Sequence, residues 1–219
     1  MKQALLIGAT GLVGSHLLQL LLNDDRFGSV TIFVRRTAGV AHPKIKEHII
    51  DFDKPMEWQH LVKGDVMYLA LGTTLSKAGS KQAQYRVDYS YQYQFASMAA
   101  LNGVPELVLV SSAGASLKSR FFYMRMKAEL ERDIDRLDFR KKVFIRPGAL
   151  TGPRQERRVG ERFGVAVLRL VNGLGLYRRY RPIHADVVAR AMVNATFTGT
   201  KGTDIHELDA VFRLAEQDN

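Results

Sequence analysis

Four side chains with complementary chemistry occur within residues 107–134 of the sequence. Ser111 and Ser112 end an apolar run, and Tyr123 and Lys127 follow at the spacing of about one helical turn. A tyrosine hydroxyl can exchange a proton with a substrate, although it normally ionises only near about pH 10. A lysine ammonium on the same helix face favours the phenolate, and a serine hydroxyl can polarise a carbonyl group.

This set predicts acid–base chemistry on a carbonyl or an alcohol. Tyr123 would be the acid/base, Lys127 its electrostatic partner and Ser112 the anchor of the carbonyl oxygen. We prefer Ser112 to Ser111, because Ser111 could simply end the strand. A tyrosine and a lysine on a solvated helix face would have the same spacing, so the surrounding elements must decide between the two interpretations.

Short apolar runs and longer helical patterns alternate around these residues. Strands are predicted at residues 4–8, 30–34, 47–51, 66–71, 106–110 and 142–146, and helices at 12–23, 56–62, 80–102 and 121–137. Nearly continuous apolar strands separated by helices are typical of a parallel sheet covered on both faces. The sequence therefore predicts an α/β fold with a doubly wound parallel sheet, the Rossmann type.

The alternation stops after Pro147, without a linker that would divide the chain. Residues 147–182 are rich in Gly, Pro and Arg around a predicted helix at 161–172, and a helix at 185–197 and a strand and helix within 203–216 follow. We expect a single domain, 1–219. Its cofactor-binding core would be residues 1–146, and residues 147–219 would supply a small C-terminal substrate flap and closing elements.

A glycine-rich turn follows the first predicted strand directly. Gly8, Gly11 and Gly14 lie between this strand and the first predicted helix. Glycines at such a place let the backbone approach a pyrophosphate, which binds the free N–H groups at the positive end of the helix. The turn predicts dinucleotide binding, with a purely structural turn as the alternative.

The second predicted strand ends in Arg35 and Arg36. Proteins that bind NAD usually have an Asp or Glu here, which accepts hydrogen bonds from the ribose hydroxyls. Guanidinium groups suit a phosphate instead. The arginines therefore favour NADP(H) over NAD(H), and a solvated loop is the alternative.

The third and fourth predicted strands end at the same edge of the sheet. Asp51 and Phe52 follow the third strand, where they could contact an adenine, although Asp51 could equally cap a turn. Leu71 and Gly72 end the fourth strand, and Gly72 would bring the backbone close to the middle of the cofactor.

Five motifs cover nearly the whole chain: GATGLVG, VRR, ALGTT, VSSAGA with YMRMK, and FIRPGALTGPRQERR. Together they resemble an atypical short-chain dehydrogenase/reductase, and most closely the Tat-interacting-protein family. The resemblance implies a Rossmann fold that binds NADPH. The cofactor contacts that it implies are Thr10, Gly11, Leu12, Val13, Arg35, Arg36, Leu71, Gly72, Tyr123, Lys127, Leu150 and Arg158.

These features predict an NADP(H)-dependent oxidoreductase that transfers hydride between the nicotinamide and a carbonyl or alcohol of a small molecule. An NADPH-binding regulator with little catalysis is the alternative, because one fold can serve both roles. A nucleotide-sugar epimerase is disfavoured by Arg35 and Arg36 and by the short region after residue 147.

The net charge of +10 is concentrated in one segment. Residues 140–181 contain 12 Lys or Arg and 2 Asp or Glu, and the rest of the chain has 20 basic and 20 acidic residues. The segment could be a lid that meets the cofactor phosphates and an anionic substrate, a surface for nucleic acid, anionic lipid or an acidic protein, or a solvated face. Its aromatic residues are too few to argue for nucleic acid.

The remaining composition excludes several classes of protein. There is no cysteine, so disulfides and thiolate chemistry are absent, and the 6 histidines lack the spacing of metal ligands. No stretch is long and apolar enough for a membrane span, and the apolar run at residues 4–7 is too short for a secretory leader. We expect a cytoplasmic protein.

The predicted helix 80–102 is apolar or aromatic on two sides. Tyr85, Tyr89 and Tyr93 share one face, and other apolar residues occupy nearly the opposite face. A surface helix should be apolar on one side only. The pattern predicts either deep burial of this helix or a homodimer interface formed by the tyrosine face.

Overall fold

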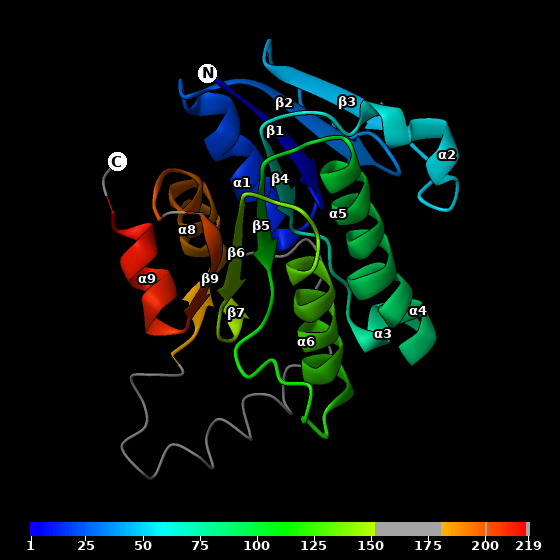
Figure 1. Cartoon of the computed structure of the whole chain (residues 1–219), viewed down its shortest axis with the longest axis vertical. Helices are drawn as coiled ribbons and strands as arrows, with labels where there is room; N and C mark the ends of the chain where they lie inside the picture. Colours follow the sequence, from blue (N-terminus) through cyan, green and yellow to red (C-terminus); the bar gives the residue numbers. More distant parts are fainter. Residues whose placement is uncertain (152–180, 200, 218–219) are drawn as a thin grey trace.

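A computed structural model describes residues 1–151, 181–199 and 201–217 of the chain (Figure 1). Seven strands form one parallel sheet in the order β3-β2-β1-β4-β5-β6-β9. Their bounds are β1 Lys2–Ile7, β2 Phe27–Val34, β3 Ile45–Ile49, β4 Val66–Leu69, β5 Glu106–Val110, β6 Lys141–Arg146 and β9 Gly202–Glu207. The strand order reverses between β1 and β4, which confirms the predicted doubly wound Rossmann fold. In such folds, ligands bind at the carboxyl ends of the two strands where the order reverses.

Helices cover both faces of this sheet (Figure 1). One face carries α1, Leu12–Asn23, with α8, Ala185–Phe197, and α9, Asp209–Ala215; the other carries α5, Tyr91–Leu101, and α6, Phe122–Asp135. Strand β1 shows why both faces need a cover. Leu6 packs in the core beside α1, whereas its neighbours Leu5 and Ile7 pack in the core beside α5. Strands buried on both faces explain the nearly continuous apolar runs of the sequence.

The predicted helix 80–102 is divided in the structure. Helix α4 spans Lys81–Tyr85. Ser80 caps its N-terminus, because the Ser80 hydroxyl accepts a hydrogen bond from the Ala83 N–H. A π-helical turn, Arg86–Ser90, then leads into α5. A short helix α3, Leu75–Ala78, precedes them and was not predicted. The predicted helix at 56–62 corresponds to α2, Pro55–Trp58, and a 3₁₀ turn, Gln59–Leu61.

The tyrosine face of the predicted helix 80–102 packs partly against α6. Tyr85, Tyr89 and Tyr93 are half-buried and stack in sequence, with ring centroids 4.6 Å and 5.9 Å apart. The Tyr89 hydroxyl donates to Asp133 Oδ2 on α6 at 2.7 Å. The face is therefore used within the chain, and the homodimer stays a prediction.

The C-terminal part is continuous with the core. Strand β9 is the seventh strand of the main sheet, and α8 packs against α1. Two short strands, β7 Leu150–Thr151 and β8 Ile183–His184, pair in parallel at the border of the predicted flap. Residues 152–180, which include the predicted helix 161–172 and Arg158, lie outside the described residues.

Candidate functional site

The glycine turn between β1 and α1 is required by close backbone contacts. Gly8 has φ +84°, a conformation that side chains disfavour, and a Cβ there would lie 2.4 Å from the carbonyl carbon of Ala70, which follows β4. A Cβ on Gly14 would lie 1.9 Å from the Gly8 carbonyl oxygen. These two glycines bring β1, α1 and the end of β4 together, so the fold alone explains them.

Gly11 has a different environment, and it fits a bound phosphate. It is exposed at the N-terminus of α1. A Cβ there would lie 3.1 Å from the Gly8 oxygen and 3.8 Å from the Ala70 oxygen. No side chain caps this helix, and its first turn has no acidic residue. The N–H groups of this end, including that of the buried Val13, are therefore suited to an anion, and the missing side chain of Gly11 leaves room for it.

Arg35 and Arg36 directly follow β2 at the same edge of the sheet. Both are exposed, and neither forms a salt bridge with another residue in the described part of the chain. Asp51 and Phe52 lie nearby after β3, but their side chains are committed elsewhere. The Asp51 carboxylate accepts a hydrogen bond from the Asp53 N–H at 3.0 Å, and the Phe52 ring, 4% exposed, packs in the aromatic core. An adenine contact through the Phe52 ring is thus disfavoured by its burial.

Tyr123 and Lys127 lie on the first two turns of α6, as the sequence predicted. The Tyr123 side chain is half-buried, whereas the Lys127 side chain is only 3% exposed. The Lys127 Nζ atom lies 5.8 Å from the centroid of the Tyr123 ring. The lysine is therefore held within the protein beside the tyrosine and does not lie on a solvated face of the helix.

A buried acid, Asp88, joins this pair and was not singled out from the sequence. Its Oδ1 lies 3.5 Å from Lys127 Nζ, and its Oδ2 accepts a hydrogen bond from the Thr73 N–H at 2.9 Å. Burial raises the pKa of the Asp88 carboxyl, while the Lys127 ammonium and the Thr73 N–H lower it. The chain thus keeps an expensive buried carboxylate at the point where the π-helical turn, α6 and the loop after β4 meet.

One feature of the sequence could have indicated Asp88. Gln84, Asp88 and Gln92 repeat every four residues and are all buried, so they form a buried polar row along one side of the helical stretch. Burial of polar side chains in such a row requires polar partners. The partner of Asp88 is 39 positions away in the sequence, however, and helix periodicity does not reveal it.

Ser112 lies at the carboxyl end of β5 and faces the start of α6. Its hydroxyl lies 3.7 Å from the sulfur of Met124, the residue after Tyr123, and 3.3 Å from the Ala113 oxygen. Ser111 is 4% exposed, and its hydroxyl has no hydrogen-bond partner among the described residues. Accessibility therefore agrees with the preference for Ser112.

Charged residues of β6 and β9 hold the serine loop. Arg146 makes two hydrogen bonds to the buried Glu131 of α6, at 3.0 Å and 2.5 Å. Glu207, at the end of β9, lies 3.9 Å from Arg146 and accepts a hydrogen bond from the Gly114 N–H at 2.8 Å. These contacts connect α6 to the loop that carries Ser112, and the sequence analysis did not anticipate them.

The structure therefore brings most of the predicted site to one edge of the sheet. The glycine turn, Gly72, Ser112, Tyr123 and Lys127 all lie at or beyond the carboxyl ends of β1, β4 and β5. Gly72 follows β4, and a Cβ on it would lie 3.3 Å from Asp88 Oδ1. The half-buried Leu71 precedes Gly72, and the half-buried Leu150 starts β7.

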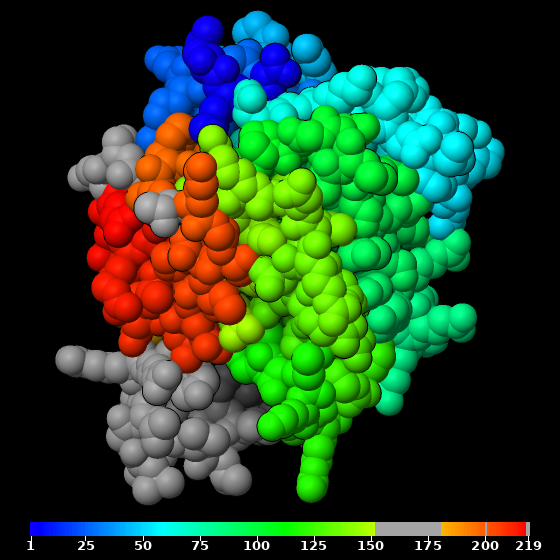
Figure 2. All heavy atoms as spheres, viewed as in Figure 1, coloured from blue at the N-terminus to red at the C-terminus, as the bar shows by residue number. Residues whose placement is uncertain are grey.

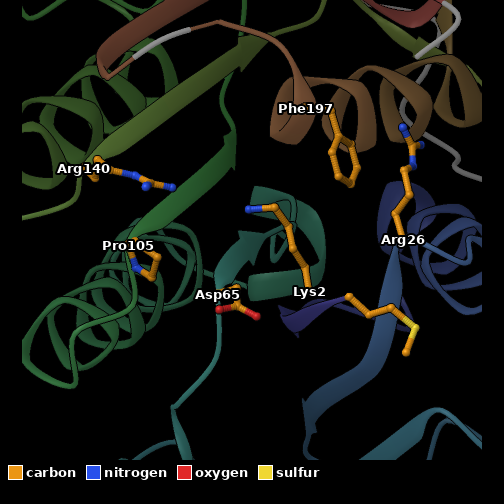
Figure 3. Close-up of a pocket in the computed structure, with 7 residues that line it drawn as sticks. Lys2, Arg26, Asp65, Pro105, Arg140 and Phe197 are labelled. Atoms are coloured by element: carbon orange, nitrogen blue, oxygen red, sulfur yellow. The ribbon is translucent and has the colours of Figure 1, made fainter.

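A pocket of about 620 Å³ lies at the opposite, amino-terminal edge of the sheet (Figure 3). Its charged side chains already have partners. Lys2 and Arg140 both contact Glu106, at 3.0 Å and 2.6 Å, and Arg26 contacts Asp24 at 2.7 Å. This pocket is remote from the glycine turn and carries none of the predicted site residues, so the carboxyl edge remains the candidate site.

Comparison with known proteins shows the family to which the chain belongs. Residues 8–195 match the family described as NAD(P)H-binding. The chain belongs to this family, whose model covers most of its length. Two similar proteins are both called Protein FMP52, mitochondrial. That of Aspergillus fumigatus is 37% identical over 217 residues, covering 93% of this chain and 89% of the relative, and that of Saccharomyces cerevisiae is 34% identical over 210 residues, covering 91% and 89%.

Solved structures show the same fold at low sequence identity. MoeE5 in complex with UDP-glucuronic acid and NAD has a TM-score of 0.71 at 18% identity, over 94% of this chain and 76% of MoeE5. UDP-glucose 4-epimerase of Thermotoga maritima with UDP-glucose has a TM-score of 0.69 at 14% identity, over 98% of this chain and 81% of the epimerase. The NAD(P)-binding Rossmann fold that the resemblance implied is thereby confirmed, and an atypical short-chain dehydrogenase fits this fold, whereas the narrower resemblance to the Tat-interacting-protein family stays a prediction.

The comparisons correct the predicted location. The FMP52 relatives are named as mitochondrial proteins, and the expectation of a cytoplasmic protein is therefore wrong. That expectation depended on the lack of a long apolar run, which is the signal for secretion. Mitochondrial targeting uses other signals. Among the helices of the described residues, none has the length and apolar character to span a membrane.

Proposed function

We propose that the protein is an NADP(H)-dependent oxidoreductase of the short-chain dehydrogenase type, acting on a carbonyl or alcohol of a small molecule. The observation that carries this proposal is the buried Lys127 beside Tyr123, at the same sheet edge as the glycine turn. A dinucleotide site alone would support only cofactor binding. A tyrosine with a buried ammonium beside it adds the group needed for proton transfer.

The residues of the site divide the chemistry among them. Bound nicotinamide supplies or accepts the hydride at the substrate carbon. In the reducing direction, the Tyr123 O–H bond breaks and its proton moves to the substrate oxygen. The Lys127 ammonium stabilises the phenolate that remains, and the Ser112 hydroxyl donates a hydrogen bond to the same substrate oxygen, which holds the carbonyl in place.

The preference for NADP(H) rests on Arg35 and Arg36. Their guanidinium groups follow β2 and are exposed, and no carboxylate of the described residues neutralises them through a salt bridge. A 2′-phosphate on the adenine ribose offers them bidentate hydrogen bonds, whereas a bare ribose hydroxyl would lack an acceptor.

The substrate is proposed to be a small molecule that reaches the site from the side of residues 111–121. This segment lies at the lower surface of the molecule, in bright green (Figure 2). It includes Phe121, which is 76% exposed directly before α6, and Leu117. The predicted preference for an anionic substrate depends on the basic residues at 152–180, which lie outside the described residues.

The test is a carbonyl substrate screen with wild-type protein and the Tyr123→Phe variant at saturating NADPH. Phenylalanine keeps the ring that packs beside Lys127 and removes only the hydroxyl. We expect at least about a thousandfold loss of turnover in the variant, near the usual range for a general acid, with the Kd for NADPH changed less than about twofold.

The controls distinguish an enzyme from a cofactor-binding regulator. A wild-type protein that binds NADPH but consumes none across the screen would support the regulator. Equal turnover by wild type and Tyr123→Phe would remove Tyr123 from the mechanism while leaving cofactor binding intact.

A further inference from the structure

Asp53, Arg86 and Tyr91 form a cluster between the loop after β3 and the helical stretch that follows β4. The Asp53 Oδ1 atom accepts hydrogen bonds from the Arg86 guanidinium at 2.5 Å and from the Tyr91 hydroxyl at 2.8 Å. The Arg86 guanidinium also lies 5.8 Å from the centroid of the Tyr91 ring. Although the Arg86 side chain is 59% exposed, these contacts hold its guanidinium in one place.

This cluster borders the half of the crevice where the adenosine of a dinucleotide would bind. Asp53 follows β3, which pairs with β2, and β2 ends directly before Arg35. Burial and the Asp53 carboxylate raise the pKa of the Tyr91 hydroxyl, and the Arg35 guanidinium opposes this rise. Arg35 therefore lies within electrostatic range of Tyr91. The ends of β2 and β3 and the helical stretch at Arg86–Tyr91 thus surround one corner of the sheet edge.

Two aromatic side chains of this corner belong to the core. The Phe52 ring is 4% exposed and packs edge-on against Tyr91, with ring centroids 5.3 Å apart. The Trp58 ring is 1% exposed and stacks on Phe95. Neither ring presents a free face to a ligand. The Arg86 guanidinium, in contrast, is an exposed planar group, and guanidinium planes stack on nucleic-acid bases.

Its ion pair distinguishes Arg86 from the two arginines after β2. Arg35 and Arg36 form no salt bridge in the described part of the chain, so their full charge is available to a phosphate. Asp53 neutralises much of the charge of Arg86 and fixes its orientation. A guanidinium with a fixed plane and a reduced net charge suits a neutral aromatic ring better than a phosphate.

We propose that Arg86, held by Asp53 and Tyr91, stacks on the adenine ring of the cofactor. The base is then recognised by a residue of the helical stretch after β4, independently of the arginines that meet the 2′-phosphate. This inference rests on the proposed function and deepens it, because it assigns a residue to the base of the dinucleotide.

The experiment measures the Kd values of adenosine 2′,5′-bisphosphate and adenosine 5′-phosphate by competition with NADPH. Both ligands carry the adenine, and only the first carries the 2′-phosphate. In Arg86→Met the side chain keeps its approximate length without its plane and charge, and Arg86→Lys keeps the charge without the plane. We expect both Kd values to rise about tenfold in Arg86→Met and at least about threefold in Arg86→Lys, with their ratio unchanged.

A nuclear Overhauser measurement separates direct contact from an effect through the fold. In the wild-type protein with bound adenosine 2′,5′-bisphosphate, the adenine H2 or H8 proton should show a contact to the side-chain CH₂ protons of Arg86. The matched control is Arg26→Lys, because Arg26 forms a similar ion pair with Asp24 at the opposite edge of the sheet. This control should leave both Kd values unchanged. If Arg86→Met does not fold, Arg86→Lys and the Overhauser contact decide.

Three results would overturn the inference. Weaker binding of the bisphosphate alone, restored in Arg86→Lys, would make Arg86 a phosphate ligand. Unchanged Kd values in the Arg86 variants would remove Arg86 from the site. Weaker binding of both ligands without an Overhauser contact in wild type would show that Arg86 acts only through the fold. Wild-type protein that binds neither ligand nor NADPH would refute the proposed function as well, so the two failures are distinguishable.

Discussion

Three glycines in one turn have two different physical roles, although the sequence pattern treats them alike. Gly14 is fixed by a backbone contact, since a Cβ there would lie 1.9 Å from the Gly8 oxygen. Gly11 is exposed, and a Cβ added to it would lie 3.1 Å from the Gly8 oxygen. Gly14 therefore serves the fold, and we infer that Gly11 serves the ligand.

Substitution by alanine should separate these roles. Gly14→Ala should lower the free energy of unfolding by more than about 3 kcal/mol, because β1 and α1 must move apart. Gly11→Ala should fold with a loss of less than about 1 kcal/mol and should raise the Kd for NADPH at least about tenfold, because its methyl group occupies the space for the phosphate. Urea unfolding and fluorescence titration measure both quantities. Normal NADPH binding by a folded Gly11→Ala protein would contradict the assignment of the phosphate site.

The π-helical turn before α5 is joined to α6 by a polar contact that depends on pH. Asp133 accepts hydrogen bonds from Arg132 on its own helix and from Tyr89 across the interface. The Arg132 guanidinium holds the pKa of the Asp133 carboxyl below its ordinary value, with smaller contributions from Tyr89 and Arg136 against the opposing effect of burial. A lowered pKa in the folded state means that the carboxylate stabilises the protein above its unfolded pKa, and that this stability is lost as the pH falls through the folded pKa.

The variant Asp133→Asn should therefore be less stable than wild type by about 1 kcal/mol at pH 7. The difference should shrink as the pH falls below about 4, where wild-type Asp133 also becomes neutral. Urea unfolding at several pH values checks this expectation. A difference that stays constant down to about pH 2.5 would show that packing, and not charge, accounts for the contribution of Asp133.

At the level of elements, the sequence predicted most of the fold and much of the site. Periodicity located α1 and β5 with the bounds that the structure has. It missed the division of the helix at Arg86–Ser90, since a π-helical turn preserves the apolar pattern on both sides. It could not show that Phe52 turns into the aromatic core or that Asp88 contacts Lys127, because both depend on which elements lie side by side.

The whole molecule brings its site together from elements that are distant in the sequence. The glycine turn belongs to the first strand and helix, Thr73 follows β4, and Lys127 lies on α6. A ligand that contacts all three can bind only the folded chain, and its binding energy is therefore added to the stability of the entire domain. The C-terminal strand β9 is coupled to the same assembly, because Glu207 holds the loop after β5.

Cofactor binding should therefore raise the midpoint of thermal unfolding of the whole chain in one cooperative transition. At an NADPH concentration about one hundred times its Kd, the stabilisation is about 2.7 kcal/mol, which corresponds to roughly 5–10 °C for a chain of this size. NADH at the same concentration should give a smaller shift, since it offers no phosphate to Arg35 and Arg36. Gly11→Ala provides the control, because it should unfold at nearly the wild-type temperature without ligand and respond little to NADPH. Equal shifts with NADPH and NADH would contradict the role of the two arginines, and a shift in only part of the unfolding transition would show that the C-terminal elements unfold independently of the cofactor-binding core.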